Sequence, residues 1–184
     1  MQRRVDLSPP RGGEWLKLWR LYLRAFPAAE RKPIRRILKK YRRGLARIWA
    51  IRRDGTFAGL VMTAESPELV QLDYLAVSPE ERNSGLGGEA LRLLRENLNG
   101  RPMFLEIEDA DQPGPDQELR RRRRGFYLRC GLEPLGIRAE VYDVRMELLG
   151  WDCEMTFDDY IAFYRDYYRP QAAEKIHQLP YPER

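Results

Sequence analysis

Apolar positions along the chain recur at two spacings, which divide it into helices and strands. Where they recur every three or four residues, they lie on one face of a helix. Stretches of this kind, together with capping signals such as Thr156 with Asp159 three residues later, predict helices over residues 14–26, 32–43, 85–98, 117–130 and 156–168. Pro27 and Gly44 end the first two helices, because proline lacks a backbone N–H group and glycine favours a helix end.

Shorter apolar runs between turn residues predict strands over residues 45–51, 56–64, 69–77, 103–108, 132–138 and 141–148. Asp54-Gly55 joins the first two as a hairpin, because both central residues of a two-residue turn need positive φ angles. The order of the elements predicts an α/β fold of the α+β kind. In it, helices cover both faces of a mixed, largely antiparallel central sheet of about six to seven strands.

The length of 184 residues favours one domain. We expect residues 1–150 to form this domain and residues 151–184 to add a C-terminal aromatic helical extension that packs on it. The extension has more aromatic side chains than a lone terminal helix can bury: Trp151, Phe157, Tyr160, Phe163, Tyr164, Tyr167 and Tyr168. They pack over the sheet, cover a substrate pocket or form the surface of a homodimer, and the sequence leaves these alternatives open.

The composition excludes several classes of protein. Hydrophobic residues make up 43% and charged residues 33% of the chain, a balance typical of a soluble globular protein and not of a disordered one. No apolar run approaches the roughly 18 residues that span a bilayer, and the N-terminal stretch lacks the apolar core of a secretory signal. Cys130, Cys153 and His177 form neither a disulfide framework nor a zinc-binding spacing. We therefore expect a reduced, cytoplasmic protein with no metal and no membrane contact.

The net charge of +5 favours an anionic partner, which a phosphorylated cofactor, a nucleic acid or an acidic substrate would satisfy. A glycine-rich segment, residues 82–88, follows the strand that ends at Val77 and leads into a helix. The first N–H groups of a helix have no partner inside it, and the helix dipole adds partial positive charge there. Glycines let a phosphate approach the main chain because they have no Cβ. The segment therefore predicts a cradle for a pyrophosphate.

This segment resembles the acyl-CoA-binding motif of the GNAT superfamily, Gln/Arg-x-x-Gly-x-Gly/Ala after a strand that ends in Leu-x-Val-x-Pro. The matching residues are Leu75, Val77, Pro79, Arg82, Gly85 and Gly87. Residues 125–132 (GFYLRCGL) resemble a second family block, Phe-Tyr-x-x-x-Gly-Phe, with Leu132 in place of the usual aromatic residue. Phe26-Pro27 and Glu30-Arg31 resemble the first helix junction of several bacterial members. The resemblance covers about residues 13–148.

The resemblance implies a GNAT-like fold and acetyl-CoA as the co-substrate. The pantetheine arm would bind the backbone of Leu75, Ala76 and Val77 as an added strand would. The pyrophosphate would bind the backbone N–H groups of Arg82, Asn83, Ser84, Gly85, Leu86, Gly87 and Gly88. An amine of a small molecule or a peptide would attack the thioester directly in a ternary complex, an oxyanion would form, and the CoA thiolate would leave.

The same glycines also fit a loose dinucleotide-binding pattern. Gly85, Gly87 and Ala90 match its spacing, and Glu106 lies where an acid could bind a ribose. In that fold, however, the first glycine follows the strand almost directly, whereas here residues 78–84 intervene. The chain also has one strand–helix–strand unit where a dinucleotide domain needs several. The acyl-CoA interpretation is therefore the favoured one.

Tyr127 lies four residues before Gly131, where many GNAT enzymes have a tyrosine that protonates the departing thiolate. A phenol with a pKa near 10 keeps its proton at neutral pH and can give it to a developing thiolate. The alternative is a core tyrosine whose hydroxyl group is satisfied inside the fold.

The attacking amine must lose a proton, which requires a base or a chain of water molecules. Glu106 and Glu108 alternate with apolar residues and point to one face of their strand. Glu106 is our first candidate, as a base or as a binder of a cationic substrate, and Asp73 and Glu65 are further candidates. Each of them could equally be a solvated carboxylate.

Five consecutive arginines, residues 120–124, suggest a nucleic-acid contact. On a helix they spread around every face, which does not suit a focused reader of a groove, so nucleic acid is not the favoured partner. Arg120, Arg123 and Arg124 lie on roughly the face of Tyr127 and could reach a CoA phosphate or an acidic substrate. The favoured function is N-acetylation, and the alternative is a non-catalytic module that binds acyl-CoA or nucleic acid.

Overall fold

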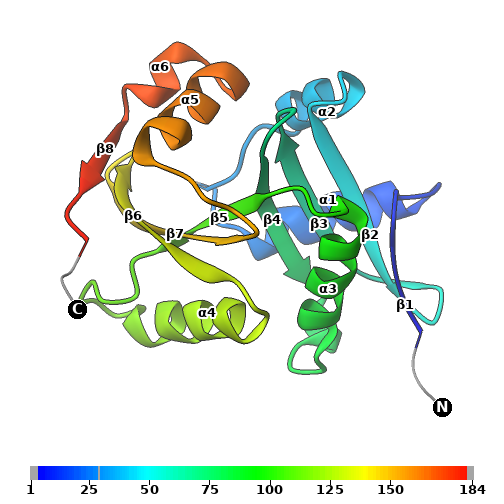
Figure 1. Ribbon diagram of the computed structural model, residues 1–184. Helices are drawn as coiled ribbons and strands as arrows, with labels where there is room; N and C mark the ends of the chain where they lie inside the picture. The colour runs from blue at the N-terminus through cyan, green and yellow to red at the C-terminus, as the bar shows by residue number, and fades with distance from the viewer. Residues whose placement is uncertain (1–3, 29, 182–184) are drawn as a thin grey trace. The chain divides into compact units, whose positions relative to one another are not determined.

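The computed structural model describes residues 4–28 and 30–181. These residues form eight strands and six α-helices, which confirms the expected α/β fold class with one or two strands more than predicted. The strand order is β1-β2-β3-β4-β5-β7-β6-β8 (Figure 1). The pairings β1–β2, β2–β3, β5–β7, β6–β7 and β6–β8 are antiparallel, and β4–β5 is parallel.

The chain divides into two compact units. The first comprises Met1–Glu65 and Leu72–Gly100, and the second comprises Ser66–Gln71 and Arg101–Arg184. Strand β4 crosses the boundary, because Val70 and Gln71 pair with β5 inside the second unit. The separate extension predicted for residues 151–184 stays a prediction.

The first unit has its helices on both faces of its strands. Its elements are β1 (Val5–Ser8), α1 (Glu14–Ala25), α2 (Ile34–Arg42), β2 (Ala46–Arg53), β3 (Thr56–Glu65), β4 (Val70–Val77, in part), the 3-10 helix η1 (Pro79–Glu81) and α3 (Leu86–Leu98). Leu18 of α1 and Ile37 of α2 pack in one core cluster with Ile48 of β2. Trp49, the next residue, points to the other face of the strand, where α3 lies (Figure 1).

The second unit also has strands between helices. Its elements are β5 (Met103–Glu108), α4 (Gln117–Arg129), β6 (Glu133–Val141), β7 (Val144–Trp151), α5 (Phe157–Tyr167), α6 (Pro170–Ala173) and β8 (Ile176–Leu179). Helix α5 packs on β5, where the Phe104 ring meets the Phe163 ring edge-on at 5.2 Å between centroids. Thr156 caps α5 by accepting the Asp159 N–H at 3.2 Å, as the sequence predicts.

Two turns decide where the hairpins begin and end. Asp54 and Gly55 have φ angles of 51° and 78°, which confirms the predicted hairpin between β2 and β3. Tyr142 and Asp143 have φ angles of 50° and 65°, so β6 continues to Val141 and β7 starts at Val144. The strand predicted over residues 141–148 therefore began three residues too early. No helix within the described residues is both long enough and apolar enough to cross a bilayer.

Candidate functional site

The glycine loop (residues 82–88) lies in the first unit, between β4 and α3. The Ser78 N–H group donates to the Ala58 carbonyl at 2.8 Å and fixes the end of β4 against β3. After η1, Asn83 and Gly85 take φ angles of 59° and 80°, in the left-handed region. A Cβ on Gly85 would meet no heavy atom within 4 Å, so glycine is needed there for its backbone conformation and not for space.

The start of α3 offers backbone donors. The first hydrogen bond inside the helix runs from the Glu89 N–H group to the Gly85 carbonyl at 3.2 Å, so the N–H groups of the preceding residues have no helical acceptor. Leu86 is buried and anchors the first turn in the core, whereas Gly87 and Gly88 are partly exposed. Backbone donors, the helix dipole and bare glycines together form a cradle that suits an anion.

Arg82 contributes to the loop in a different way from the one the sequence predicts. Its backbone N–H group already donates to the Pro79 carbonyl at 3.3 Å. Its side chain is exposed, as are those of Asn83 and Ser84. What Arg82 offers an anion is therefore its guanidinium group.

The side chain of Arg53, on β2, holds the glycine loop in place, a role that the sequence did not indicate. Its guanidinium group forms an ion pair with Glu81 and donates to the Ser84 carbonyl at 3.4 Å. The Ser84 hydroxyl group in turn donates to the Glu81 carbonyl at 2.6 Å. Arg53 thereby neutralises the one acid of η1 that bonds to the loop. Its only sequence signal is that it ends a strand just before the Asp54-Gly55 turn.

The residues predicted to bind pantetheine end strand β4. Leu75, Ala76 and Val77 are partly exposed, whereas the strand is buried at Val70. On the neighbouring strand, a Cβ on Gly59 would lie 2.5 Å from the Ala76 carbonyl oxygen, so only glycine allows the two backbones this close approach. Gly59 is a second positioning residue that the sequence did not single out.

The acids proposed as alternative bases are already paired in the first unit. Both carboxylate oxygens of Asp73 accept from the Lys32 ammonium group, at 2.7 and 2.8 Å. Glu65 is buried and accepts from the Thr63 hydroxyl group at 2.8 Å, and Arg47 pairs with it at 3.1 Å. These bonds hold both carboxylates in place within the first unit.

Tyr127 lies in the last turn of α4, in the second unit. Its side chain is partly buried and packs edge-on against Phe126, with 5.1 Å between ring centroids. Burial raises the pKa of Tyr127 to about 12, while the positive charge of Arg123 acts in the opposite direction. The hydroxyl group therefore keeps its proton throughout the neutral range.

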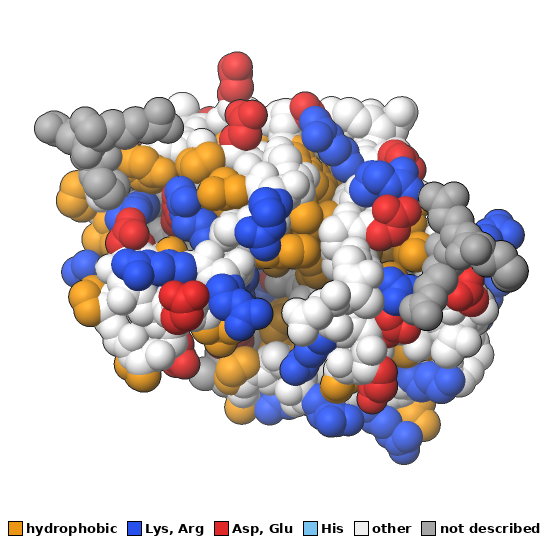
Figure 2. All heavy atoms as spheres, turned by 90° about the horizontal axis from the view of Figure 1, so that it is seen from below, with side chains coloured by type: hydrophobic (Ala, Val, Ile, Leu, Met, Phe, Trp, Pro, Cys, Tyr) orange, Lys and Arg blue, Asp and Glu red, His pale blue; other side chains and the backbone are white. Residues whose placement is uncertain are grey.

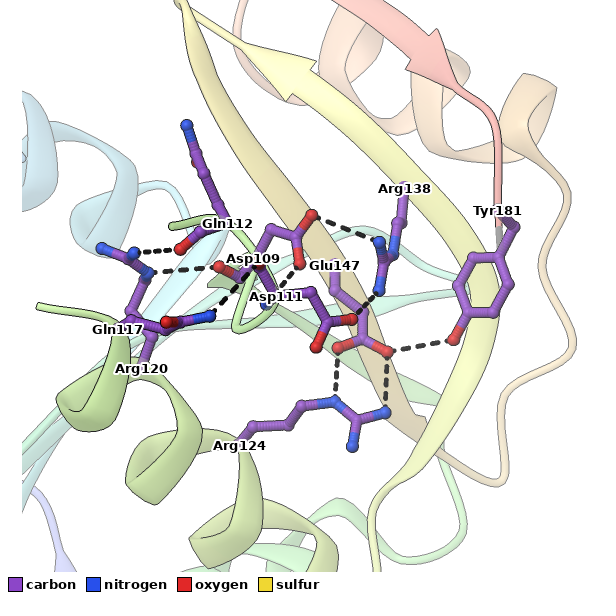
Figure 3. Close-up of polar contacts among 9 residues, drawn as sticks. All are labelled: Asp109, Asp111, Gln112, Gln117, Arg120, Arg124, Arg138, Glu147 and Tyr181. Atoms are coloured by element: carbon purple, nitrogen blue, oxygen red, sulfur yellow. Dashed lines mark hydrogen bonds and ion pairs between the residues drawn. The ribbon is translucent and has the colours of Figure 1, made fainter. Parts of the chain in front are cut away.

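The arginine run holds α4 in place. Arg124 donates to both carboxylate oxygens of buried Glu147, at 2.6 and 3.1 Å, and the Tyr181 hydroxyl group donates to the same carboxylate at 3.0 Å (Figure 3). Arg120 donates to the Asp109 carbonyl at 3.1 Å, and Arg123 pairs with a carboxylate of β5 at 3.4 Å. The three arginines expected to face a ligand thus have partners within the chain. The face of the molecule in Figure 2 carries charges of both signs side by side.

Glu106 is the centre of a hydrogen-bond network in the second unit. Its Oε1 atom accepts from the hydroxyl groups of Tyr160 and Tyr164, both at 2.8 Å, and from the Gln71 amide at 3.0 Å. The Tyr168 hydroxyl group donates to the Gln71 amide oxygen at 2.7 Å. Burial and the charge of Glu106 raise the pKa of Tyr160 well above its ordinary value, so this tyrosine stays a donor.

The structure thus brings some of the predicted residues together. Leu75–Val77 and the glycine loop are neighbours in the first unit. Glu106 and Tyr127 both belong to the second unit. Glu106 lies on β5 and accepts hydrogen bonds from tyrosines of α5, whereas Tyr127 lies on α4. The sequence missed the tyrosines of α5 as partners of Glu106, because the pairing depends on how α5 packs. Among the described residues, no cluster of three or more His, Cys, Asp or Glu side chains is arranged to hold a metal ion.

Comparisons with known proteins point to one family. A sequence profile described as "Acetyltransferase (GNAT) family" matches residues 15–132. The protein YjbC of Bacillus subtilis (strain 168), which carries a provisional acetyltransferase assignment, is 37% identical over 70 residues, 38% of this chain and 34% of that protein. The chain thus spans about a third of the length of this curated relative.

Solved structures share the fold. A provisionally assigned GNAT-family acetyltransferase from Bacteroides thetaiotaomicron matches with a TM-score of 0.69 and 23% identity, over 89% of this chain and 98% of that chain. A GNAT-family acetyltransferase from Elizabethkingia anophelis with acetyl-CoA bound matches with a TM-score of 0.59 and 14% identity, over 81% of this chain and 98% of that chain. At these identities the similarity concerns the fold.

Proposed function

Because the chain belongs to the GNAT acetyltransferase family, we propose that it is an N-acetyltransferase, which moves the acetyl group of acetyl-CoA to an amine of a small molecule or a peptide. The observation that carries the proposal is the glycine loop. There the left-handed Gly85 and the partly exposed glycines of the first turn of α3 leave backbone donors open to an anion.

The first unit binds the co-substrate in this proposal. The N–H groups of Leu86, Gly87 and Gly88 bind the pyrophosphate, and the Arg82 guanidinium group adds charge beside them. The partly exposed backbone at Leu75, Ala76 and Val77 binds the pantetheine amides as a neighbouring strand would.

Acetyl-CoA supplies a thioester, whose carbonyl carbon forms a bond to the amine nitrogen while its bond to sulfur breaks. Tyr127 gives its hydroxyl proton to the departing sulfur in this proposal. Burial raises the pKa of Tyr127 to about 12, so the residue still holds its proton when the sulfur leaves. The positive charge of Arg123 favours the phenolate that remains.

Glu106 provides negative charge for a cationic amine and receives its proton, directly or through water. Two tyrosine hydroxyl groups and one amide hydrogen-bond to its Oε1 atom and stabilise the ionised form. We assign this role to Glu106 in preference to Asp73, because Lys32 already neutralises the Asp73 carboxylate.

Two measurements test the proposal. Acetyl-CoA raises the melting temperature, because a ligand that binds only the folded state stabilises it. Gly87→Glu abolishes the shift by placing bulk and negative charge in the cradle, whereas Asn97→Glu, at the other end of the same helix, preserves it. Release of free CoA from a panel of amines then identifies the acceptor. Stabilisation by NAD but not by acetyl-CoA would overturn the proposal.

A further inference from the structure

Positive charge is concentrated in one segment of the chain. Between Arg11 and Arg47 there are thirteen Lys and Arg residues and two Asp and Glu residues, a balance of +11. Because the whole chain carries +5, the remaining residues together carry −6. The excess therefore belongs to the part of the first unit that contains α1 and α2.

Eight of these cations are exposed on the outer sides of the two helices. Leu18 of α1 and Ile37 of α2 pack in the same core cluster on one face of the strands, so the opposite sides of both helices face solvent together. The exposed cations, which we call the basic helix face, are Lys17, Arg20, Arg24, Arg35, Arg36, Lys39, Arg42 and Arg43.

The basic helix face differs from the other arginine clusters of the molecule. Arg52, Arg124 and Arg138 each bond to one or two carboxylates. Within the described residues, none of the eight exposed cations forms an ion pair. Glu14, one of the two acids of the segment, is turned to Arg52 and accepts from it at 2.8 and 2.6 Å. Like charges that face solvent without partners repel each other, and a polyanion would relieve that repulsion.

We propose that the basic helix face binds the phosphate backbone of a nucleic-acid duplex without reading its sequence. The charge density supports this partner. At about 1.5 Å per residue, the eight cations lie on stretches of about 10 to 12 Å along the two helices. A duplex presents a phosphate every ~1.7 Å, or about seven over that length, whereas an extended peptide covers it with about four residues.

The residue types support the same partner. Six of the eight cations are arginines, whose planar guanidinium groups bind phosphate oxygens in pairs. The aromatic side chains of α1 and α2 are partly or fully buried, whereas single-strand binders use exposed aromatic rings to stack on bases. The proposal is independent of acetyl transfer, because it concerns other residues and needs no turnover.

The test is fluorescence anisotropy with a labelled 24-base-pair DNA duplex and the full chain. The affinity falls steeply between 50 and 200 mM salt, as expected for phosphate contacts. The double variant Arg35→Gln and Lys39→Gln keeps good helix formers and weakens binding at least tenfold at low salt. It also reduces the slope of log K against log salt by about two, one for each lost contact. The matched control, Arg121→Gln with Arg122→Gln on α4, removes two exposed arginines and leaves binding unchanged.

Other outcomes overturn the proposal. If the control variant loses as much affinity, the binding reflects net charge alone. If poly-L-glutamate of equal charge competes as well as the duplex, the face recognises carboxylates. Because Leu16 and Leu23 are exposed on α1, vesicles containing phosphatidylglycerol are the third arm, and tighter binding to them would assign the face to a lipid surface. Equal acetyl-CoA thermal shifts in all variants confirm that each is folded.

Discussion

The glycine loop of the first unit is built from backbone, whereas the network of the second unit is built from side chains. The loop depends on two left-handed residues, Asn83 and Gly85, and on donors that every residue has. The second unit depends on particular hydroxyl, amide and carboxylate groups, in the network around Glu106 and, separately, in the bonds to Glu147. A site built from backbone groups loses its ligand when the local backbone conformation changes. A side-chain network loses single hydrogen bonds when single residues are replaced.

This difference predicts that the two regions respond separately to mutation. Changes in the second unit should lower stability or turnover and leave acetyl-CoA binding intact. Changes in the glycine loop should weaken acetyl-CoA binding beyond any effect that they have on stability. The variants below test this separation, and each has a control that makes the same chemical change elsewhere.

The largest effect on stability is expected for Glu147→Gln. The variant leaves the Arg124 guanidinium group without its buried counter-charge, which lowers the free energy of unfolding by about 3 kcal/mol, the lower end for a broken buried pair because Arg124 is partly exposed. The dissociation constant of acetyl-CoA stays unchanged. Urea denaturation and calorimetric titration measure the two quantities. Glu133→Gln, at an exposed position, is the control, and a tenfold weaker affinity in Glu147→Gln would contradict the separation of the two regions.

Tyr127→Phe is expected to lower kcat by on the order of 10²-fold, because it removes the acid that protonates the leaving sulfur and keeps the ring. Acetyl-CoA affinity and melting temperature stay as they are. Steady-state kinetics with the preferred amine provide the measurement. Tyr142→Phe removes a tyrosine hydroxyl group from an exposed turn and leaves kcat unchanged. Full turnover in Tyr127→Phe would assign the residue to packing alone.

Glu106→Gln is expected to lower kcat/KM for a cationic amine by about tenfold and to move the rising limb of the pH–rate profile, which reports the essential base of the free enzyme. Glu108→Gln, two residues along the same strand, is the control for a general loss of negative charge. An unaltered pH profile in both variants would place the base elsewhere.

Comparing Gly85→Ala with Gly100→Ala distinguishes the effect of backbone strain on stability from an effect on acetyl-CoA binding. Gly85 and Gly100 both have a φ angle of 80° and open space beside them, at opposite ends of α3. Alanine at either position costs about 1 kcal/mol of backbone strain. Both variants therefore melt earlier, but only Gly85→Ala weakens acetyl-CoA binding, by several-fold. Equal affinities in the two variants would show that the loop does not bind the co-substrate.

The smallest effect concerns pH. An ordinary phenol loses half of its protons near pH 10, whereas the pKa of Tyr127 is raised to about 12 by burial. Because the proton is kept to higher pH, kcat should stay level between about pH 9 and 11 and fall only as the pH rises through 12. A weakly basic aniline as acceptor keeps the ionisation of the substrate out of this window. A fall centred near pH 10 would contradict the assignment.

Local patterns made part of the molecule predictable. The Asp54-Gly55 turn, the Thr156 cap and the helix after Gly85 each depend on neighbours in sequence, and the structure contains all three. Strands β1 and β8 were not predicted, because four residues carry too little periodicity and these strands form by pairing with β2 and β6. The end of β6 and the start of β7 were placed wrongly, because the Tyr142-Asp143 turn between them contains no glycine to mark it in the sequence.

The glycine loop was predictable for the same reason, since seven consecutive residues contain it. The contacts between residues far apart in the sequence were not predictable. Glu81 meets Arg53, which precedes it by 28 residues, and Glu106 meets tyrosines 54 and 58 residues further along. Such pairs depend on the packing of whole elements, so a single sequence indicates which residues are polar but not which of them meet.

The two ends of the strand order have a consequence for self-association. The sheet ends on its shortest strands, β1 and β8, of four residues each. An open edge presents backbone groups to which a strand of another molecule can add, and long flat edges are where aggregation begins. Here each edge is short and carries an exposed polar side chain, Asp6 on one and His177 on the other. Templated growth of β-sheet between molecules therefore has little backbone to start from, and concentrated protein should stay free of fibrils on storage.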